Sequence, residues 1–297
     1  MAELNLDGVG VALVTPFQQD FSIDYQALDK LIHHIIRGGC DYIVALGTTA
    51  ESPTLTKSEK SDLAGFIRKK VDGRVPLVIG IGGNNTYGVV EDIKSMDLEG
   101  YTAILSVTPY YNKPTQEGLF KHYKTICENS PLPILLYNVP GRTGVNLSAE
   151  TTIRLANFSD KFCGVKEASG KLDQCADIIK NTPHNFSVVA GDDALISKMM
   201  KIGSTGVISV LANVYPEVIK NIVTLCKSHN YIEADYYQKE LSQLIIHLFR
   251  DGNPSGVKAL LAKMGFVKNV LRLPLVPVSA EVENKLEEES VRLFNTN

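Results

Sequence analysis

The chain has 297 residues, of which 44% are hydrophobic and 21% are charged, close to the average of globular proteins. Thirty basic residues against thirty-three acidic ones give a formal net charge of −3, and the basic residues are scattered, so nucleic acid is not an expected partner. No apolar stretch reaches the roughly 18 residues that a membrane-spanning helix needs, and the N-terminus lacks the pattern of a secretion signal.

The five cysteines are odd in number and form no C-x-x-C pair, and several lie within apolar runs. Such thiols behave as small hydrophobic side chains in a reducing compartment, so we expect a cytoplasmic protein. The six histidines include no H-E-x-x-H motif and no Cys/His cluster. We therefore predict no metal site.

Eight short apolar segments, rich in β-branched residues, alternate with segments of helical period from residue 9 to about 228. Each is apolar nearly throughout, as strands buried on both faces must be. Eight such units predict a closed (β/α)8 TIM barrel, whereas a doubly wound open sheet would usually contain about six strands. The eight segments span residues 9–17, 42–47, 76–82, 103–108, 133–139, 162–169, 186–192 and 206–210.

Helix signals fall where such a barrel needs them. Thr56 and Glu59 form a capping box before the second helix, and residues 84–86 (Asn-Asn-Thr) are suited to cap the third. Beyond residue 228 we expect no further strand, only helical segments at about 231–250, 254–265 and 279–294. We therefore predict a catalytic barrel at residues 1–228 and a C-terminal helical domain at residues 229–297.

Lys166 is the strongest chemical candidate, because active sites of these barrels lie at the carboxyl ends of the strands and Lys166 lies within the sixth predicted strand. A buried ammonium must be paired, reach water, or lose its proton, and a neutral amine is a nucleophile. The alternative interpretation is a structural lysine paired with a carboxylate such as Glu167.

Other polar residues follow the second, fourth and fifth predicted strands. Thr48 and Thr49 are either turn residues or ligand donors, and Tyr111 and Tyr137 are either packed aromatics or reactive hydroxyls. Arg142 lies between two glycines in a short loop, where it is either an exposed turn charge or a guanidinium fork for a carboxylate substrate.

The motifs GTTAES, YYNKPTQEGL, YNVPGRTG and VKEASG occur in this order and resemble the dihydrodipicolinate synthase and N-acetylneuraminate lyase superfamily of pyruvate-dependent class I aldolases. The resemblance covers essentially the whole chain. It implies a (β/α)8 barrel with a C-terminal helical domain, assembled as a homotetramer that is a dimer of dimers. It also implies a lyase that condenses pyruvate with L-aspartate 4-semialdehyde to 4-hydroxy-tetrahydrodipicolinate, in lysine and diaminopimelate biosynthesis, without a cofactor.

Four catalytic roles follow from the resemblance. Lys166 would form the Schiff base with pyruvate, and Tyr137 would pass protons during its formation. Thr48 would link Tyr137 to Tyr111, which in this family enters the site from the neighbouring subunit. One departure is visible, because Ala50 stands where the family commonly has glycine.

Four further residues are implied to bind substrate. Thr49 would hold the pyruvate carboxylate together with Thr48, and Arg142 would bind the carboxylate of the aldehyde substrate. Gly191 and Ile208, at the ends of the seventh and eighth predicted strands, would line the pocket.

Two alternative functions remain at this point. An N-acetylneuraminate lyase or another sugar-acid aldolase would share the lysine and the tyrosine, but Arg142 and the residues around Thr48 disfavour it. A non-catalytic barrel that binds pyruvate-like ligands is disfavoured because Thr48, Thr49, Tyr111, Tyr137 and Lys166 all occur together.

The resemblance also indicates a candidate regulatory site, where lysine-inhibited relatives bind L-lysine at a dimer interface. Lys57 replaces a common histidine with a fixed positive charge, and Gly88 replaces a glutamate that would pair with the ligand's amino group. Both changes disfavour a cationic ligand, so we expect weak or absent inhibition. The candidate residues are Ser52, Pro53, Lys57, Asn84, Gly88 and Tyr110.

Overall fold

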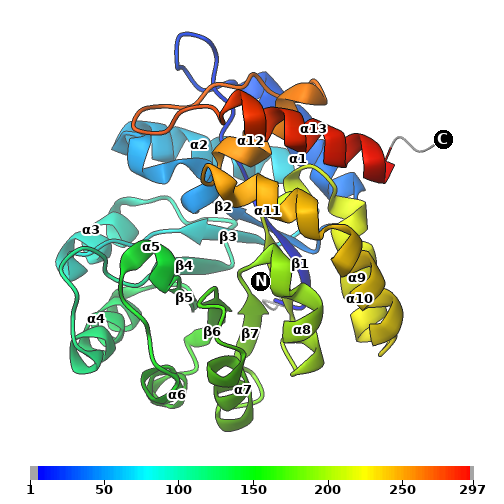
Figure 1. Ribbon diagram of the computed structural model, residues 1–297. Coiled ribbons are helices and arrows are strands. Elements are labelled where there is room, and N and C mark those ends of the chain that lie inside the picture. Colours follow the sequence, from blue (N-terminus) through cyan, green and yellow to red (C-terminus); the bar gives the residue numbers. More distant parts are fainter. Residues whose placement is uncertain (1–5, 295–297) are drawn as a thin grey trace.

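Eight parallel strands close into a barrel in the computed structural model, which describes residues 6–294 (Figure 1). β1 pairs with β8, so the sheet has no free edge. Every predicted strand segment overlaps one observed strand, which confirms the (β/α)8 barrel and excludes the open sheet. The strands are β1 Gly8–Ala12, β2 Tyr42–Ala45, β3 Leu77–Gly80, β4 Ala103–Val107, β5 Ile134–Asn138, β6 Phe162–Glu167, β7 Ser187–Ala190 and β8 Gly206–Ser209.

Close packing at the amino-terminal end of the barrel depends on glycines. A side chain at Gly206 would place its Cβ 1.9 Å from the Gly8 carbonyl oxygen, and one at Gly10 would meet the Tyr42 ring at 2.2 Å. The Tyr42 ring is fully buried and fills the space that Gly10 leaves, while the Gly8 backbone occupies the space beside Gly206. This end of the barrel is therefore a packed core, and the polar residues that follow the strands lie at the opposite end.

Helices follow every strand and cover the outside of the barrel (Figure 1). They are α1 Tyr25–Arg37, α2 Lys57–Val71, α3 Thr86–Ser95, α4 Gln116–Asn129, α5 Pro140–Thr143, α6 Ala149–Phe158, α7 Leu172–Asn181, α8 Ile196–Lys201 and α9 Pro216–Lys227.

The capping box of α2 is confirmed, since the Thr56 hydroxyl accepts from the Glu59 N–H and the Glu59 carboxylate accepts from the Thr56 N–H. The side-chain cap predicted for α3 is wrong. Asn85 occupies the N-cap position without a side-chain capping bond. Its neighbours bond elsewhere, because the Asn84 amide donates to the Tyr110 carbonyl and the Thr86 hydroxyl bonds to a buried histidine ring.

Four helices form the C-terminal segment: α10 Tyr231–Glu240, α11 Ser242–Arg250, α12 Ser255–Lys263 and α13 Ala280–Phe294. The helix predicted at 231–250 is thus two helices that meet at Leu241. α10 packs against α8 and α9, while α11, α12 and α13 pack against one another beside the barrel (Figure 1). The domain boundary at residue 228 stays a prediction.

Within residues 6–294, no helix combines the length and the apolar character that crossing a membrane requires. All five cysteines have free thiols, and four of them are buried. In the same part of the chain, no group of three or more His, Cys, Asp or Glu side chains is arranged to hold a metal ion.

Candidate active site

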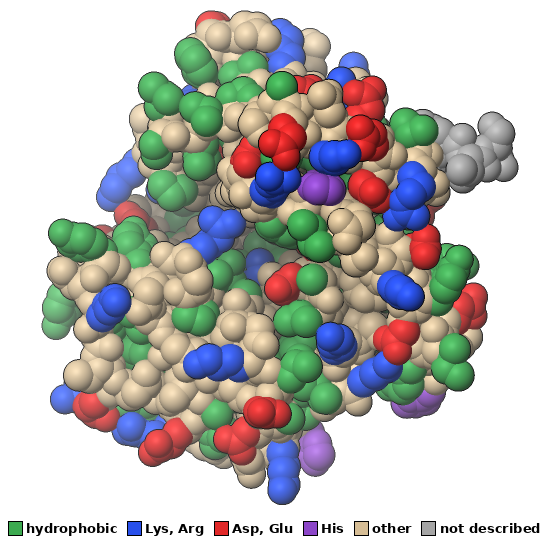
Figure 2. Space-filling view, viewed as in Figure 1, with side chains coloured by type: hydrophobic (Ala, Val, Ile, Leu, Met, Phe, Trp, Pro, Cys, Tyr) green, Lys and Arg blue, Asp and Glu red, His purple; other side chains and the backbone are tan. Residues whose placement is uncertain are grey.

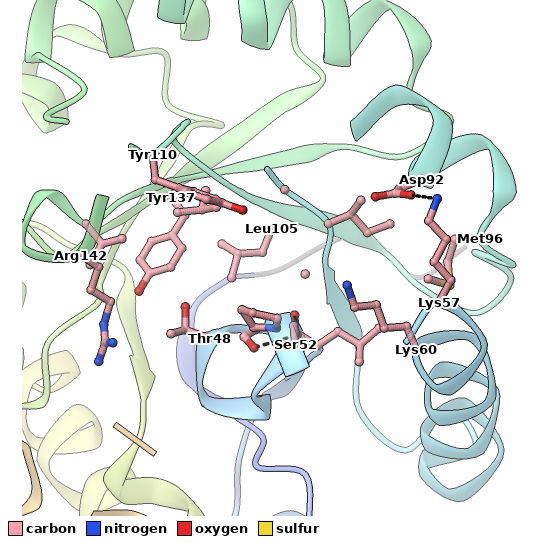
Figure 3. A pocket seen from close by; sticks show the side chains of 18 of the residues that line it. Thr48, Ser52, Lys57, Lys60, Asp92, Met96, Leu105, Tyr110, Tyr137 and Arg142 are labelled. Atoms are coloured by element: carbon pink, nitrogen blue, oxygen red, sulfur yellow. Dashed lines mark hydrogen bonds and ion pairs between the residues drawn. The ribbon is translucent and has the colours of Figure 1, made fainter. Parts of the chain in front are cut away.

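A cavity of about 650 Å³ opens at the carboxyl ends of β2 to β5 and extends outward between α2 and α3. In the space-filling view, the face beneath the C-terminal helices is hollowed at the barrel mouth (Figure 2). Three of the predicted catalytic and substrate-binding residues line this cavity, namely Thr48, Tyr137 and Arg142. Figure 3 shows the Tyr137 and Thr48 hydroxyls pointing toward each other, with Arg142 extending alongside Tyr137.

Lys166 lies next to Tyr137 at the barrel mouth. The two residues are register partners on β5 and β6, and the Lys166 Nζ lies 4.5 Å from the centre of the Tyr137 ring. Both side chains are buried, with Lys166 only 5% exposed. No carboxylate within the described residues forms an ion pair with Lys166, so the amine faces an aromatic ring and not a counter-ion.

Glu167 does not pair with Lys166, because successive residues of a strand point to opposite faces of the sheet. Its carboxylate accepts instead from the Asn138 amide at 3.0 and 3.2 Å, from the Gln174 amide at 3.1 Å and from the Ser169 N–H at 2.8 Å. Three donors therefore satisfy this buried carboxylate on the outer face of β6. The alternative interpretation of Lys166 as the partner of Glu167 is wrong.

A short 3₁₀ turn, Thr48–Ala50, carries both predicted threonines directly after β2. The Thr15 hydroxyl donates to the Ala50 carbonyl at 2.8 Å, and the Ser52 hydroxyl donates to the Gly47 carbonyl at 3.0 Å. These bonds fix the turn against the barrel. Ala50 is buried, and the turn accommodates its methyl group where a glycine was expected.

Gly191 leaves room for the lysine side chain. A Cβ at this position would lie 3.1 Å from the Lys166 Cγ and 2.8 Å from the Ala168 Cβ. Ile208 is buried on β8, which pairs with β1 and β7. Gly191 thus lies beside the side chain of Lys166, while Ile208 adds an apolar side chain to the barrel interior.

Arg142 lies in the short helix α5. This helix ends at Gly144, which adopts the left-handed conformation with φ 72°. The buried Thr143 hydroxyl accepts from the Thr108 hydroxyl at 3.3 Å and ties this helix to β4. The guanidinium of Arg142 is exposed and has no acidic partner in the described part of the chain. Its donors are therefore available to an anionic ligand.

Tyr111 stands apart from the other predicted catalytic residues. Its side chain is 84% exposed, it does not line the cavity of its own chain, and its backbone φ of 72° is unusual for a residue with a side chain. Among residues 6–294, no hydrogen bond joins it to Thr48 or Tyr137. Within the described chain, the structure therefore does not bring Tyr111 together with the other predicted catalytic residues.

The candidate regulatory residues gather at the outer end of the same cavity. Ser52, Pro53, Lys57 and Tyr110 line it, and Asn84 and Gly88 lie beside it at the start of α3. The Lys57 ammonium pairs with Asp92 of α3 at 3.0 Å, as Figure 3 shows. Lys60, which sequence reasoning missed, adds a second positive charge to this end of the cavity.

Sequence reasoning also missed residues that contact the threonine turn from far along the chain. The Asn253 amide donates to the Thr49 hydroxyl at 2.9 Å, and the Lys258 ammonium pairs with Glu51. Burial lowers the pKa of Lys258 to about 8, although Glu51 acts in the opposite direction. The signal in the sequence was a lysine within the apolar helix α12.

The fold and the site define a class: a (β/α)8 barrel whose mouth holds a buried lysine amine beside tyrosine and threonine hydroxyls, as imine formation requires. The chain belongs to the dihydrodipicolinate synthetase family, whose model matches residues 5–291. This finding confirms the family that the four motifs indicated.

Individual relatives agree over nearly their whole length. A 4-hydroxy-tetrahydrodipicolinate synthase of Parabacteroides distasonis is 50% identical over 288 residues, which is 97% of each chain. The crystal structure of dihydrodipicolinate synthase from Aquifex aeolicus is 38% identical with a TM-score of 0.94, covering 98% of each chain. The chloride-inhibited enzyme of Acinetobacter baumannii, solved with pyruvate, is 37% identical with a TM-score of 0.93, covering 96% of this chain and 98% of that one.

Proposed function

We propose that this chain is a Schiff-base-forming lyase that condenses pyruvate with L-aspartate 4-semialdehyde to give 4-hydroxy-tetrahydrodipicolinate, in lysine and diaminopimelate biosynthesis. The observation that carries the proposal is Lys166, a buried lysine without a carboxylate partner in the described chain, whose Nζ lies 4.5 Å from the Tyr137 ring centre. The name and the near-complete coverage of the Parabacteroides distasonis relative support the same reaction.

The reaction starts from the neutral amine of Lys166. The amine nitrogen attacks the keto carbon of pyruvate, and the carbonyl oxygen leaves as water, so that a protonated imine forms. The imine withdraws electrons from the adjacent methyl group, which loses a proton to give an enamine. The enamine carbon then adds to the aldehyde carbon, and the aldehyde oxygen takes up a proton to become the 4-hydroxyl group.

Release of the product requires a second nitrogen. The amino group of the former aspartate semialdehyde attacks the imine carbon and closes a six-membered ring. The bond from that carbon to the Lys166 nitrogen then breaks, and the amine returns to its starting form. No cofactor takes part in these steps, because the imine itself serves as the electron acceptor.

Proton transfer is assigned to three hydroxyls. Tyr137 lies beside Lys166 and donates to the departing oxygen, while Thr48 faces Tyr137 across the cavity (Figure 3). Tyr111 of a second chain completes the relay, since hydroxyl groups can accept and donate protons in turn. The exposure of Tyr111 in the single chain supports this arrangement.

Two sites hold the two carboxylates. Thr48 and Thr49 bind the pyruvate carboxylate through hydroxyl and backbone N–H donors at the start of a short turn. Arg142 binds the carboxylate of the aldehyde substrate through its planar guanidinium fork. Gly191 and Ile208 line the pocket beside Lys166.

The assembly in this proposal is a homotetramer that is a dimer of dimers, located in the cytoplasm. The need for Tyr111 from a neighbouring chain supports the dimer, and the five free thiols support a reducing compartment. Residues 1–228 supply the reacting groups, and residues 229–297 form the C-terminal helical domain.

The experiment that tests the proposal is a coupled assay in which purified protein receives pyruvate and aspartate semialdehyde. We expect formation of the cyclic product with saturation by both substrates. A parallel assay with N-acetylneuraminate tests the sugar-acid alternative. Cleavage of the sugar acid without condensation of aspartate semialdehyde would contradict the proposal.

A further inference from the structure

The turn that carries Thr48 and Thr49 has a backbone conformation that its own sequence does not favour. Leu46 and Glu51 lie on either side of it with φ values of 54° and 56°. Residues with a Cβ rarely adopt this left-handed region, and non-glycine examples persist where surrounding contacts impose them. The conformation of this turn therefore depends on contacts from other parts of the molecule.

Several of these contacts come from the C-terminal segment. The Asn253 Nδ2 donates to the Thr49 Oγ1 at 2.9 Å, between residues 204 positions apart in the sequence. The Lys258 Nζ donates to the Glu51 Oε1, and the Arg272 N–H donates to the Glu51 Oε2 at 3.1 Å. The C-terminal segment thus contacts both the middle and the end of the turn.

The pair of Lys258 and Glu51 is enclosed by protein. Both side chains are 0% exposed. The Lys258 ammonium also donates to the Val270 carbonyl at 2.9 Å and lies 4.2 Å from the centre of the Phe17 ring. A buried charge has few alternative partners, so displacement of either residue would leave an uncompensated charge. The pair fixes Glu51, and with it the end of the turn, relative to α12.

The bond from Asn253 also sets the direction in which the Thr49 hydroxyl can donate. A threonine hydroxyl has one proton and two acceptor lone pairs. One lone pair of Thr49 receives the Asn253 amide proton, the Asn253 Oδ1 is buried without a partner, and among residues 6–294 no hydrogen bond donated by the Thr49 hydroxyl is found. The proton is therefore available for an anionic ligand at the barrel mouth.

We propose that Asn253 and Lys258 are positioning residues, which hold the turn at residues 48–51 so that its hydroxyl and N–H donors bind the carboxylate of pyruvate. This inference rests on the proposed function, because it assigns the pyruvate carboxylate to Thr48 and Thr49. The C-terminal segment would then affect the affinity for pyruvate through two side chains that do not touch the substrate.

The sharpest test is Asn253→Asp, which keeps the shape of the side chain and replaces the amide donor with an acceptor. The Thr49 hydroxyl would then donate to the introduced carboxylate and no longer to pyruvate. Because hydrogen bonds to charged groups are among the stronger ones, we expect the KM for pyruvate to rise by about tenfold or more. The KM for aspartate semialdehyde should stay within about twofold, since Arg142 is assigned to that substrate.

The matched control is Ser255→Ala, which removes the bond from the Ser255 hydroxyl to the Val276 carbonyl in the same segment. It should leave the KM for pyruvate unchanged. Asn253→Ser is a second, neutral variant in case Asn253→Asp fails to fold, and it should raise the same KM by about threefold or more, a smaller loss because no charge is added.

Two results would overturn the inference. One is an unchanged KM for pyruvate in the folded Asn253 variants. The other is an equal rise in KM for both substrates, which would indicate a general structural role. Trapping of pyruvate on Lys166 of the wild-type protein by borohydride distinguishes failure of this inference from failure of the proposed function. If no adduct forms on Lys166, the proposed function itself is contradicted.

Discussion

Lys166 and Tyr137 are register partners on neighbouring strands, and the Lys166 Nζ lies 4.5 Å from the centre of the Tyr137 ring. Residues paired in this way on adjacent strands project from the same face of the sheet. The backbone pairing of β5 and β6 therefore places the proposed nucleophile beside the proposed proton donor before any substrate binds.

Tyr111→Phe should lower kcat on the order of 10²-fold, because it removes one hydroxyl from a proton relay. The melting temperature should change little, since the variant loses one hydroxyl group and keeps the aromatic ring. Tyr87→Phe, a change at another exposed tyrosine, is the matched control and should retain full activity. Sedimentation of the wild-type protein checks the role of the second chain, and a fully active monomer would contradict it.

Arg142→Ala should raise the KM for aspartate semialdehyde by about tenfold or more, because a hydrogen-bonded charge pair contributes roughly 1.5–3 kcal/mol. Imine formation from pyruvate should largely persist. Arg142→Lys keeps the charge but loses the planar fork, so an intermediate KM is expected. Steady-state kinetics with each substrate varied in turn decide the matter, and equal damage to both would argue against this assignment.

L-Lysine should inhibit weakly or not at all. Lys57 and Lys60 place two ammonium groups at the outer end of the cavity, and the nearby Asp92 carboxylate is already paired with Lys57 at 3.0 Å. Gly88 supplies no side chain that could attract a cation. A lysine titration at saturating substrates measures the effect, and inhibition below millimolar lysine would show the prediction to be wrong. The double variant Lys57→His with Gly88→Glu should gain sensitivity.

Lys258→Met should lower the free energy of unfolding by about 3–5 kcal/mol, because it leaves the Glu51 carboxylate buried without its ammonium partner. The double variant Lys258→Met with Glu51→Gln removes both charges and should recover a large part of that loss. Urea unfolding of the three proteins measures the difference. A single variant as stable as the wild type would mean that the pair does not hold the turn.

The sequence alone was sufficient to predict the barrel and to place several candidate residues at its mouth. Each strand is a short apolar run of local sequence, and Lys166, Tyr137 and Arg142 lie within or directly after predicted strands, so their positions required only the strand assignments. The α3 cap could not be predicted in the same way, because Asn84 bonds to the Tyr110 carbonyl, which lies 26 positions away in the sequence.

Long-range contacts account for the remaining gaps. Lys258 meets Glu51 across 207 positions, and no local pattern marks either residue as a partner of the other. Tyr111 is a different case, because its assigned role depends on a neighbouring chain. The strands that form a site can be predicted from local sequence. The distant side chains that hold its loops in place cannot, because their contacts depend on the folded chain.

The most direct test of the central claim is to incubate the protein with pyruvate and borohydride and to locate the modified residue by mass mapping. We expect loss of activity and a three-carbon adduct on Lys166, because borohydride reduces an imine to a stable amine. Lys166→Ala should remain folded, take up no adduct and lack activity. An adduct on another lysine, or none, would contradict the assignment of Lys166 as the residue that forms the Schiff base.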